Sequence, residues 1–147
     1  NGVGLGHLQR LKDQVVILEL EGTLVTDDDL VHLREFSALR ILCLSRTKVT
    51  GKGLRHISDL PKLRSLKLRG ADLVSDAFAS LATFSSLERL NVNGTGLTDH
   101  DLLLLRESRS LTSIQVSAED FSKAEIDTIQ KKFDARKTDR KTQITRD

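Results

Sequence analysis

The chain has 147 residues, 38% of them hydrophobic, with no Trp, Tyr or Met and five Phe. This length predicts a single domain, and so few large apolar side chains would build only a thin central core. No apolar run approaches the about 20 residues of a membrane-spanning helix, and the opening residues lack the pattern of a signal peptide. Neither a membrane span nor a signal peptide is therefore expected, although a domain without disulfides can also be secreted.

The net charge is +2, and it is unevenly distributed. Residues 131–147 hold seven basic and three acidic side chains, an excess of +4, so the remaining residues carry −2. A partner attracted by charge alone would therefore meet the C-terminal segment. The single Cys43 cannot form an internal disulfide, which favours a reducing compartment and hence the cytoplasm.

The first segment, residues 1–14, has the spacing of a helix, with Leu5, Leu8 and Leu11 three apart. No strand pattern precedes it, so it corresponds to half of the unit that follows. This half-repeat either caps the domain or belongs to a longer protein, and the lack of a polar cap favours the second interpretation. Five full units of 24 residues come next: 15–38, 39–62, 63–86, 87–110 and 111–134.

Three apolar positions recur at the start of every unit. The first holds Val15, Leu39, Leu63, Leu87 and Leu111; the second holds Leu18, Leu42, Leu66, Leu90 and Ile114; the third holds Leu20, Leu44, Leu68, Val92 and Val116. A fixed period of this size indicates a solenoid, in which each coil packs only against its neighbours.

The unit 39–62 illustrates the expected coil. Leu42 and Leu44 are two apart, so in an extended segment they share one face while Cys43 points to the other. Leu54, Ile57 and Leu60 then follow at the spacing of a helix. Hydroxyl residues precede the helical part of four units (Thr26, Thr50, Thr98 and Ser122), and we expect them to cap its first turn. Residues 122–125 form a complete capping-box sequence.

The pattern LxxLxLxxTxVTxxGL, written here from Leu39 to Leu54, resembles the leucine-rich repeat. It is similar to a bacterial-style subgroup in which threonine, as at Thr47, stands where the family usually has asparagine. The resemblance covers residues 15–134. It implies an α/β fold, a right-handed leucine-rich-repeat solenoid in the form of an arc, with a concave parallel β-sheet of about five strands and convex helices. It also implies protein binding on the concave side.

The C-terminal end departs from the repeat. Residues 111–134 end the repeat domain 1–134, and their helix is expected to act as a cap with a polar outer face. Residues 135–147 then form a basic C-terminal tail, expected to be frayed or disordered and without core contacts. Clustered Lys and Arg can hold nucleic acid or an anionic surface, which makes this tail the alternative functional site. Acidic residues interrupt the run, so a nucleic-acid partner is disfavoured.

The outward positions of the strands are the candidate protein-binding site. In chain order this concave-face set is Ile17, Glu19, Glu21, Ile41, Cys43, Arg46, Lys67, Arg69, Arg89, Asn91, Asn93 and Gln115. It begins acidic with two isoleucines, becomes basic in the middle and ends neutral, which suggests a polarised surface. A solvated face with unselected charges is the competing interpretation. Cys43 is expected to be accessible, and neighbouring cations could make its thiol reactive.

No arrangement of catalytic residues is found, so we expect a non-catalytic, monomeric scaffold without a cofactor, binding a protein of unknown identity. His7, His32 and His56 recur at one position of successive helices, but packed helices lie about 8–10 Å apart, too far for three rings to share a zinc ion. The glycine-rich start at Gly2, Gly4 and Gly6 lacks the strand before it and the Gly-Lys-Ser/Thr after it that a phosphate loop needs.

Overall fold

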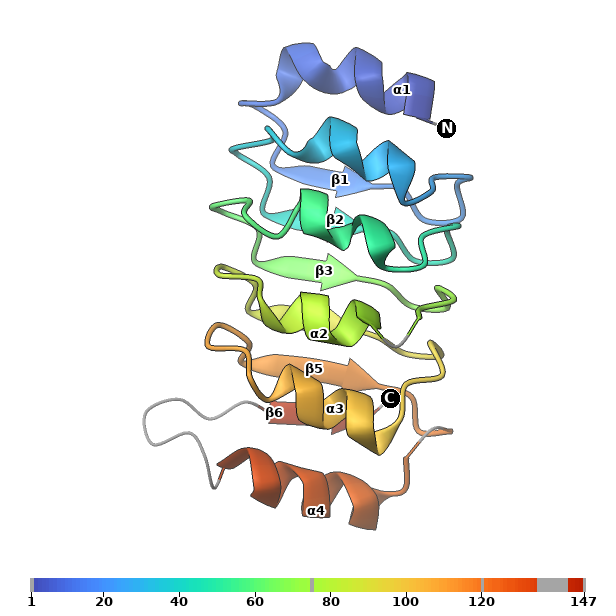
Figure 1. Cartoon of the computed structure of the whole chain (residues 1–147), viewed down its shortest axis with the longest axis vertical. Coiled ribbons are helices and arrows are strands. Elements are labelled where there is room, and N and C mark those ends of the chain that lie inside the picture. Colours follow the sequence, from blue (N-terminus) through green and yellow to red (C-terminus); the bar gives the residue numbers. More distant parts are fainter. Residues whose placement is uncertain (1, 75, 120, 135–142, 147) are drawn as a thin grey trace.

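The computed structural model describes residues 2–74, 76–119, 121–134 and 143–146. Strands and helices alternate in an α/β fold, and all strands join one parallel sheet in chain order (Figure 1). The strands are β1 (Ile17–Glu19), β2 (Ile41–Cys43), β3 (Ser65–Lys67), β4 (Arg89–Asn91), β5 (Ser113–Val116) and β6 (Gln143–Arg146).

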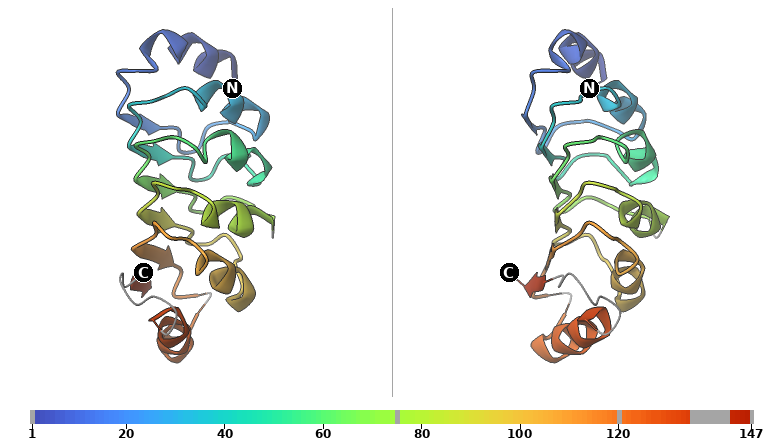
Figure 2. Two further views of the ribbon diagram at one scale, coloured as in Figure 1. Left: turned by 60° about the vertical axis from the view of Figure 1, so that its left-hand side comes forward. Right: turned by 90° about the vertical axis from the view of Figure 1, so that its left-hand side faces the viewer.

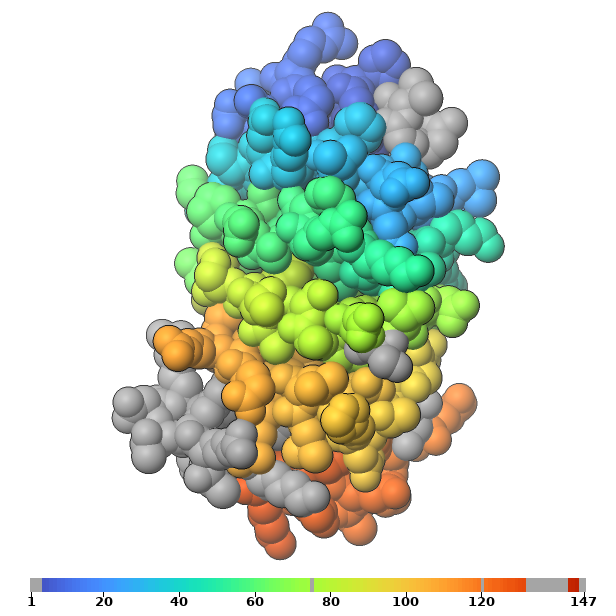
Figure 3. All heavy atoms as spheres, viewed as in Figure 1, coloured from blue at the N-terminus to red at the C-terminus, as the bar shows by residue number. Residues whose placement is uncertain are grey.

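The helical segments lie on one side of this sheet. They are α1 (Gly2–His7) continued by the 3-10 helix η1 (Leu8–Leu11), the 3-10 helices η2 (Asp28–Leu33) and η3 (Lys52–His56), then α2 (Asp76–Ala82), α3 (Asp99–Leu105) and α4 (Lys123–Asp134). Figure 2 shows the strands on the inner side of a gentle curve and the helices on its outer side. Seen from the helices, successive coils form bands from the N-terminal to the C-terminal end (Figure 3).

The predicted register is confirmed for the paired strands. Leu18 pairs with Leu42, Leu42 with Leu66, Leu66 with Leu90 and Leu90 with Ile114, always 24 residues apart. The leucines of the inner coils are fully buried between the sheet and the helices, so one continuous apolar seam forms the core. Leu18 stays only half-buried, because β1 has a neighbouring strand on one side only.

Threonines of the turn after the strand secure the backbone of three coils. The side-chain hydroxyls of Thr23, Thr47 and Thr95 donate hydrogen bonds of 2.7–2.8 Å to the carbonyl oxygen three residues earlier. Thr47 and Thr95 are buried. Each of these hydroxyls therefore finds its partner within its own coil, and the Leu20 carbonyl oxygen also accepts the backbone N–H of Thr23 (3.2 Å).

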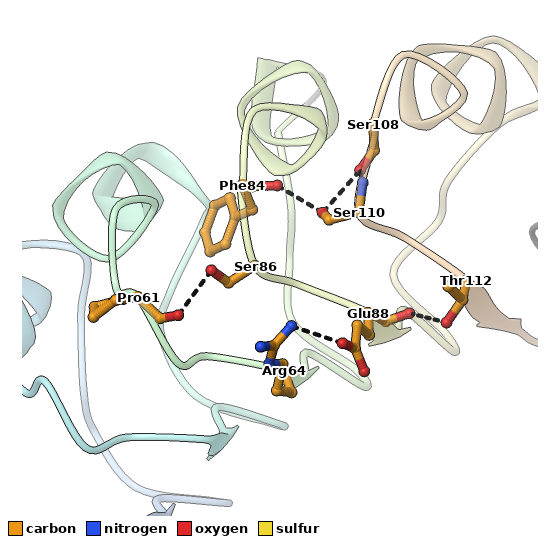
Figure 4. A network of polar contacts seen from close by, with 8 residues as sticks. All are labelled: Pro61, Arg64, Phe84, Ser86, Glu88, Ser108, Ser110 and Thr112. Atoms are coloured by element: carbon orange, nitrogen blue, oxygen red, sulfur yellow. Dashed lines mark hydrogen bonds and ion pairs between the residues drawn. The ribbon is translucent and has the colours of Figure 1, made fainter. Parts of the chain in front are cut away.

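Side chains also tie each coil to the next at the opposite end of the strands (Figure 4). The guanidinium of Arg64 lies 2.7 Å from the Glu88 carboxylate. Three hydroxyls donate to carbonyls of the preceding coil: Ser86 to Pro61 (3.0 Å), Ser110 to Phe84 (2.7 Å) and Thr112 to Glu88 (3.1 Å). Neighbouring coils thus share hydrogen bonds as well as leucine contacts.

The prediction for the C-terminal end of the repeat array was wrong in one respect. The chain was expected to have about five strands and a tail without core contacts, but residues 143–146 form β6, parallel to β5. Ile144 pairs with Ile114 and is 6% exposed, and its backbone N–H donates to the Gln130 side chain of α4 (2.9 Å). An uncovered β5 would present open backbone groups, and β6 satisfies them. Residues 135–142, the centre of the basic tail, lie outside the described residues.

The expected helix caps are confirmed at two sites. Thr98 and Asp101 form a capping box at α3, and Ser122 and Glu125 exchange the same pair of bonds (2.7 and 3.2 Å) at α4. Across the described segments, none of the helices combines the length and the hydropathy that crossing a membrane requires.

Candidate protein-binding face

The face of the sheet that points away from the helices, here called the sheet face, carries the side chains between the buried leucines. Strand pairing aligns them in rows. One row is Ile17, Ile41, Ser65, Arg89 and Ser113; the next is Glu19, Cys43, Lys67, Asn91 and Gln115. A third group, Glu21, Ser45, Arg69 and Asn93, follows two residues further on.

Cys43 is not accessible, contrary to expectation. Its side chain is 1% exposed although it points to the sheet face. Glu19 and Lys67, on the strands to either side, approach to 3.7 Å and so span the short cysteine between them. The thiol contacts the Ser45 hydroxyl at 3.4 Å. The long side chains of Glu19 and Lys67 therefore cover the short Cys43 side chain. Cys43 is accordingly removed from the set of candidate binding residues.

Arg46 occupies an unusual backbone position. It is the non-glycine residue with a positive φ (54°) among the described residues, and Gly22, Gly70 and Gly94 hold the same place in other coils with φ of 62–70°. A left-handed conformation costs a residue with a Cβ about 1 kcal/mol or more. The Arg46 guanidinium lies 3.8 Å from the Glu21 carboxylate, and its Cγ lies 3.4 Å from the point where Gly70 would carry a Cβ. The turn thus accepts a strained residue that projects a cation.

The C-terminal half of the sheet face is held by amides. The Asn91 side chain donates to the Gln115 amide oxygen (2.9 Å) and accepts from the backbone N–H of Asn93 (3.1 Å). Asn91 and Gln115 are half-buried. Asn93 is 8% exposed, so this predicted site residue offers a partner very little surface.

Arg89 stands beside a hollow in the sheet face. Its neighbours in the row are the small Ser65 and Ser113. The hollow has a volume of about 160 Å³, and Lys67 and Gln115 also line it. Arg69 and Arg89 are exposed, and within the described part of the chain neither forms an ion pair. These two cations are therefore the unengaged charges of the predicted basic patch, whereas Arg46 and Lys67 each face a glutamate.

The first two coils form the acidic start of the sheet face. Glu19 and Glu21 are exposed, Ile17 is 56% exposed and Ile41 is half-buried. The sheet face therefore runs from a glutamate and isoleucine corner, through cations, to a neutral amide end.

A second hollow, missed by sequence reasoning, lies where strands lead into helices. It measures about 410 Å³, and its cations are Lys48, Lys52 and Arg55. The Asp27 carboxylate occupies its wall and accepts bonds from the Thr50 hydroxyl (2.6 Å) and from the N–H groups of Thr50, Gly51 and Gly53 (2.8–3.1 Å). An aspartate of one coil thus caps the next coil's helix, where Thr50 itself had been expected to accept.

Burial raises the pKa of the Asp27 carboxyl, but the hydrogen bonds from Thr50, Gly53 and Gly51 outweigh it and hold the pKa below its ordinary value. The approach is close: a Cβ on Gly53 would lie 2.4 Å from the Asp27 carbonyl oxygen. The sequence signal for this close approach was the pair Gly51 and Gly53, because glycine permits backbone contact between coils.

Groups of three or more His, Cys, Asp or Glu side chains that could share a metal ion are absent from the described residues. His7 is exposed, and His32 and His56 are half-buried on the helical side. Comparison with models of known protein families and with curated proteins found no match for this chain.

Proposed function

We propose that the chain is a right-handed leucine-rich-repeat solenoid that acts as a non-catalytic protein-binding module through its sheet face. Five in-phase units of 24 residues, strands paired at that same spacing and helices on the opposite side all support this assignment. Such folds expose a broad inner surface that neighbouring units build together.

The observation that carries the proposal is Arg46. Three other coils use glycine at this turn, so an arginine there adds backbone strain that glycine would avoid. Strained residues gather at functional sites because the surrounding structure holds them for another purpose. At Arg46 the result is a cation projected onto the sheet face near Arg69 and Glu21. The proposed partner is therefore a protein that binds this charged face.

The face favours a modest affinity. Trp and Tyr, which often dominate interface energies, are absent from the chain. The available anchors are Arg46, Arg69 and Arg89, together with the apolar Ile17. Arginine is itself common among the residues that carry interface energy, and the hollow beside Arg89 gives a partner side chain a defined place to enter.

Site-directed photocrosslinking tests the proposal, because it captures a binding protein whatever its identity. A photoreactive residue at Lys67 or Gln115 of the sheet face is expected to capture proteins that the same residue at His32 or His56 of the helical side does not. Capture must also fall when Arg69→Glu and Arg89→Glu are added. Equal capture from both sides would refute a specific sheet face.

Arg46→Gly supplies the matched stability test. Glycine removes the backbone strain, so the free energy of unfolding should rise or stay unchanged within about 1 kcal/mol while capture weakens. The alternative, nucleic-acid or anionic-surface binding through residues 135–147, predicts instead that nucleic acid or an anionic surface is bound only when that segment is present, with binding falling steeply between about 50 and 200 mM salt.

A further inference from the structure

The hollow beside Arg89 exists because one long side chain stands between two short ones. Ser65, Arg89 and Ser113 are register partners on β3, β4 and β5, so their side chains leave the sheet face in one row. Neighbouring strands lie about 4.8 Å apart, and arginine reaches well beyond the serines on either side. The volume of about 160 Å³ suits a single side chain, since pockets for drug-sized ligands measure about 300–1,000 Å³.

Two amides at the edge of this hollow have fixed orientations. The backbone N–H of Asn93 can only donate, so the Asn91 atom that it contacts at 3.1 Å is the side-chain oxygen. The Asn91 nitrogen therefore faces Gln115 and donates to the Gln115 amide oxygen (2.9 Å). Both amide oxygens are thus engaged, and the N–H groups that remain on Asn91 and Gln115 are what this pair offers to a ligand.

The charges at the hollow are positive. Arg89 and Lys67 line it, and none of the described residues that line it is acidic. Within the described part of the chain Arg89 has no ion-pair partner, and the adjacent Glu88 directs its carboxylate to Arg64. The Lys67 ammonium lies 3.7 Å from the Glu19 carboxylate, which leaves it N–H groups for a further acceptor.

A carboxylate matches these groups better than other side chains do. An ionised carboxylate only accepts hydrogen bonds, and a guanidinium presents its N–H groups as a fork that bonds both carboxylate oxygens at once. The hydroxyls of Ser65 and Ser113, on either side of Arg89, are able to donate to the same oxygens. A partner's Lys or Arg would meet like charge there, and an apolar side chain would leave donors without acceptors.

We propose that the hollow beside Arg89 anchors the side-chain carboxylate of a Glu or Asp residue in the partner. This inference rests on the proposed function, because it presumes a protein bound to the sheet face. The carboxylate bonds the Arg89 guanidinium through both oxygens, accepts hydrogen bonds from the serine hydroxyls and is attracted by Lys67. The partner's contact segment is therefore acidic where it crosses β4.

Titration with single-residue probes tests the hollow without a known partner. One probe is N-acetylglutamate methylamide, whose only charge is its side-chain carboxylate; the other is the glutamine counterpart, which has nearly the same shape and no charge. Proton–nitrogen NMR spectra of the full chain report binding. We expect the glutamate probe to shift the backbone amide signals of Ser65, Arg89 and Ser113, and to bind at least about fivefold more tightly than the glutamine probe.

Variants of two arginines separate the hollow from the general charge of the face. Arg89→Gln should weaken the glutamate probe by about fivefold or more, and Arg89→Lys, which keeps the charge without the fork, should restore only part of that loss. Arg69→Gln is the matched control, because Arg69 is equally exposed on the sheet face but does not line the hollow. It should change the affinity by less than about twofold. The proposal is overturned if Arg69→Gln weakens binding as much as Arg89→Gln does, or if the glutamine probe binds equally well.

Two further outcomes identify which part of the inference fails. N-acetylglycine carries only a chain-terminal carboxylate, so tighter binding of this probe would overturn the side-chain assignment in favour of a chain end. Photocrosslinked capture at the sheet face without any response to the glutamate probe would overturn the anchor and leave the proposed function standing. A glutamate response without such capture would instead refute the proposed function, and with it the protein source of the carboxylate.

Discussion

Asp27 shows how a single side chain can connect two coils. Its carboxylate receives four hydrogen bonds from the turn that begins at Thr50, 23 residues later. Gly53 makes room for it, since a Cβ there would collide with the Asp27 backbone, whereas a Cβ on Gly51 would collide with Ala77 of the following coil. The bonded groups are backbone donors that a short 3-10 helix leaves free at its start, so Asp27 replaces the cap that η3 lacks.

Asp27→Ala is expected to lower the free energy of unfolding by about 1–3 kcal/mol at neutral pH, because four donors lose a charged acceptor. The folded protein holds the pKa of Asp27 below its ordinary value, so this stabilisation is present above about pH 4 and is lost as the pH falls further. Urea unfolding of both proteins between pH 2 and pH 7 measures it.

Asp28→Ala is the control, since Asp28 is exposed and should change stability by no more than about 0.5 kcal/mol. The Asp27 interpretation fails if the two variants are equally stable, or if the gap between Asp27→Ala and the parent widens in acid.

At this scale the sequence predicted which side chains face outward but not how they meet. Alternation placed Cys43 on the sheet face correctly, yet its burial depends on the reach of Glu19 and Lys67 from other strands. The residues around Arg46 give no sign of backbone strain. Its positive φ can be inferred only from the glycines at the equivalent position of other coils. Contacts between coils, rather than the pattern within one, decided both outcomes.

The element that sequence reasoning missed is β6. It follows residues without the 24-residue pattern, so periodicity could not reveal it. Its role is nevertheless that of a further strand: Ile144 continues the row that runs through Leu90 and Ile114, and β6 covers the edge of β5. A repeat reveals only those strands whose sequences resemble one another. The last strand, β6, needs just one apolar residue, Ile144, at the right position, so it lacks the repeat pattern.

Ile144→Ala is expected to cost about 2–4 kcal/mol, since it empties a nearly buried site at the end of the core. Thr145→Ala, the adjacent and half-buried position, should cost under about 1 kcal/mol. Chemical denaturation compares them. Equal midpoints for the parent chain and a version lacking residues 143–147 would contradict a structural role for β6.

For the whole molecule, stability is expected to depend on position along the array. Leu66 and Leu18 occupy the same place in the register, but Leu66 has strands on both sides and is fully buried, while Leu18 is half-buried. Where each coil contacts only its neighbours, an inner coil has two stabilising interfaces and the first coil has fewer.

Leu66→Ala should therefore cost about 3–5 kcal/mol and Leu18→Ala about 1–2 kcal/mol less than that. Lys67→Ala, next to Leu66 but exposed, should change stability by about 0.5 kcal/mol or less. Equilibrium unfolding of the three variants gives the order. If Lys67→Ala were the most damaging, the assignment of buried and exposed faces would be reversed.

At this largest scale the sequence was most informative. A repeat of fixed length places each leucine beside its equivalent, so the paired register from Leu18 to Ile114 followed from counting residues. The helical segments were predicted as well, although those of the first two full units, η2 and η3, are 3-10 helices. The ligand of the proposed sheet-face site is not encoded in that period, because outward residues leave the fold unchanged.

The shared bonds between coils, such as those of Ser86 and Ser110 with carbonyls of the preceding coil, have a mechanical consequence. They join each coil only to its immediate neighbour, so tension on one boundary between coils is not shared by the boundaries further along the array. A force applied across the chain ends would therefore peel the array from an end, and each full unit released would yield 24 residues, about 80 Å of extended chain.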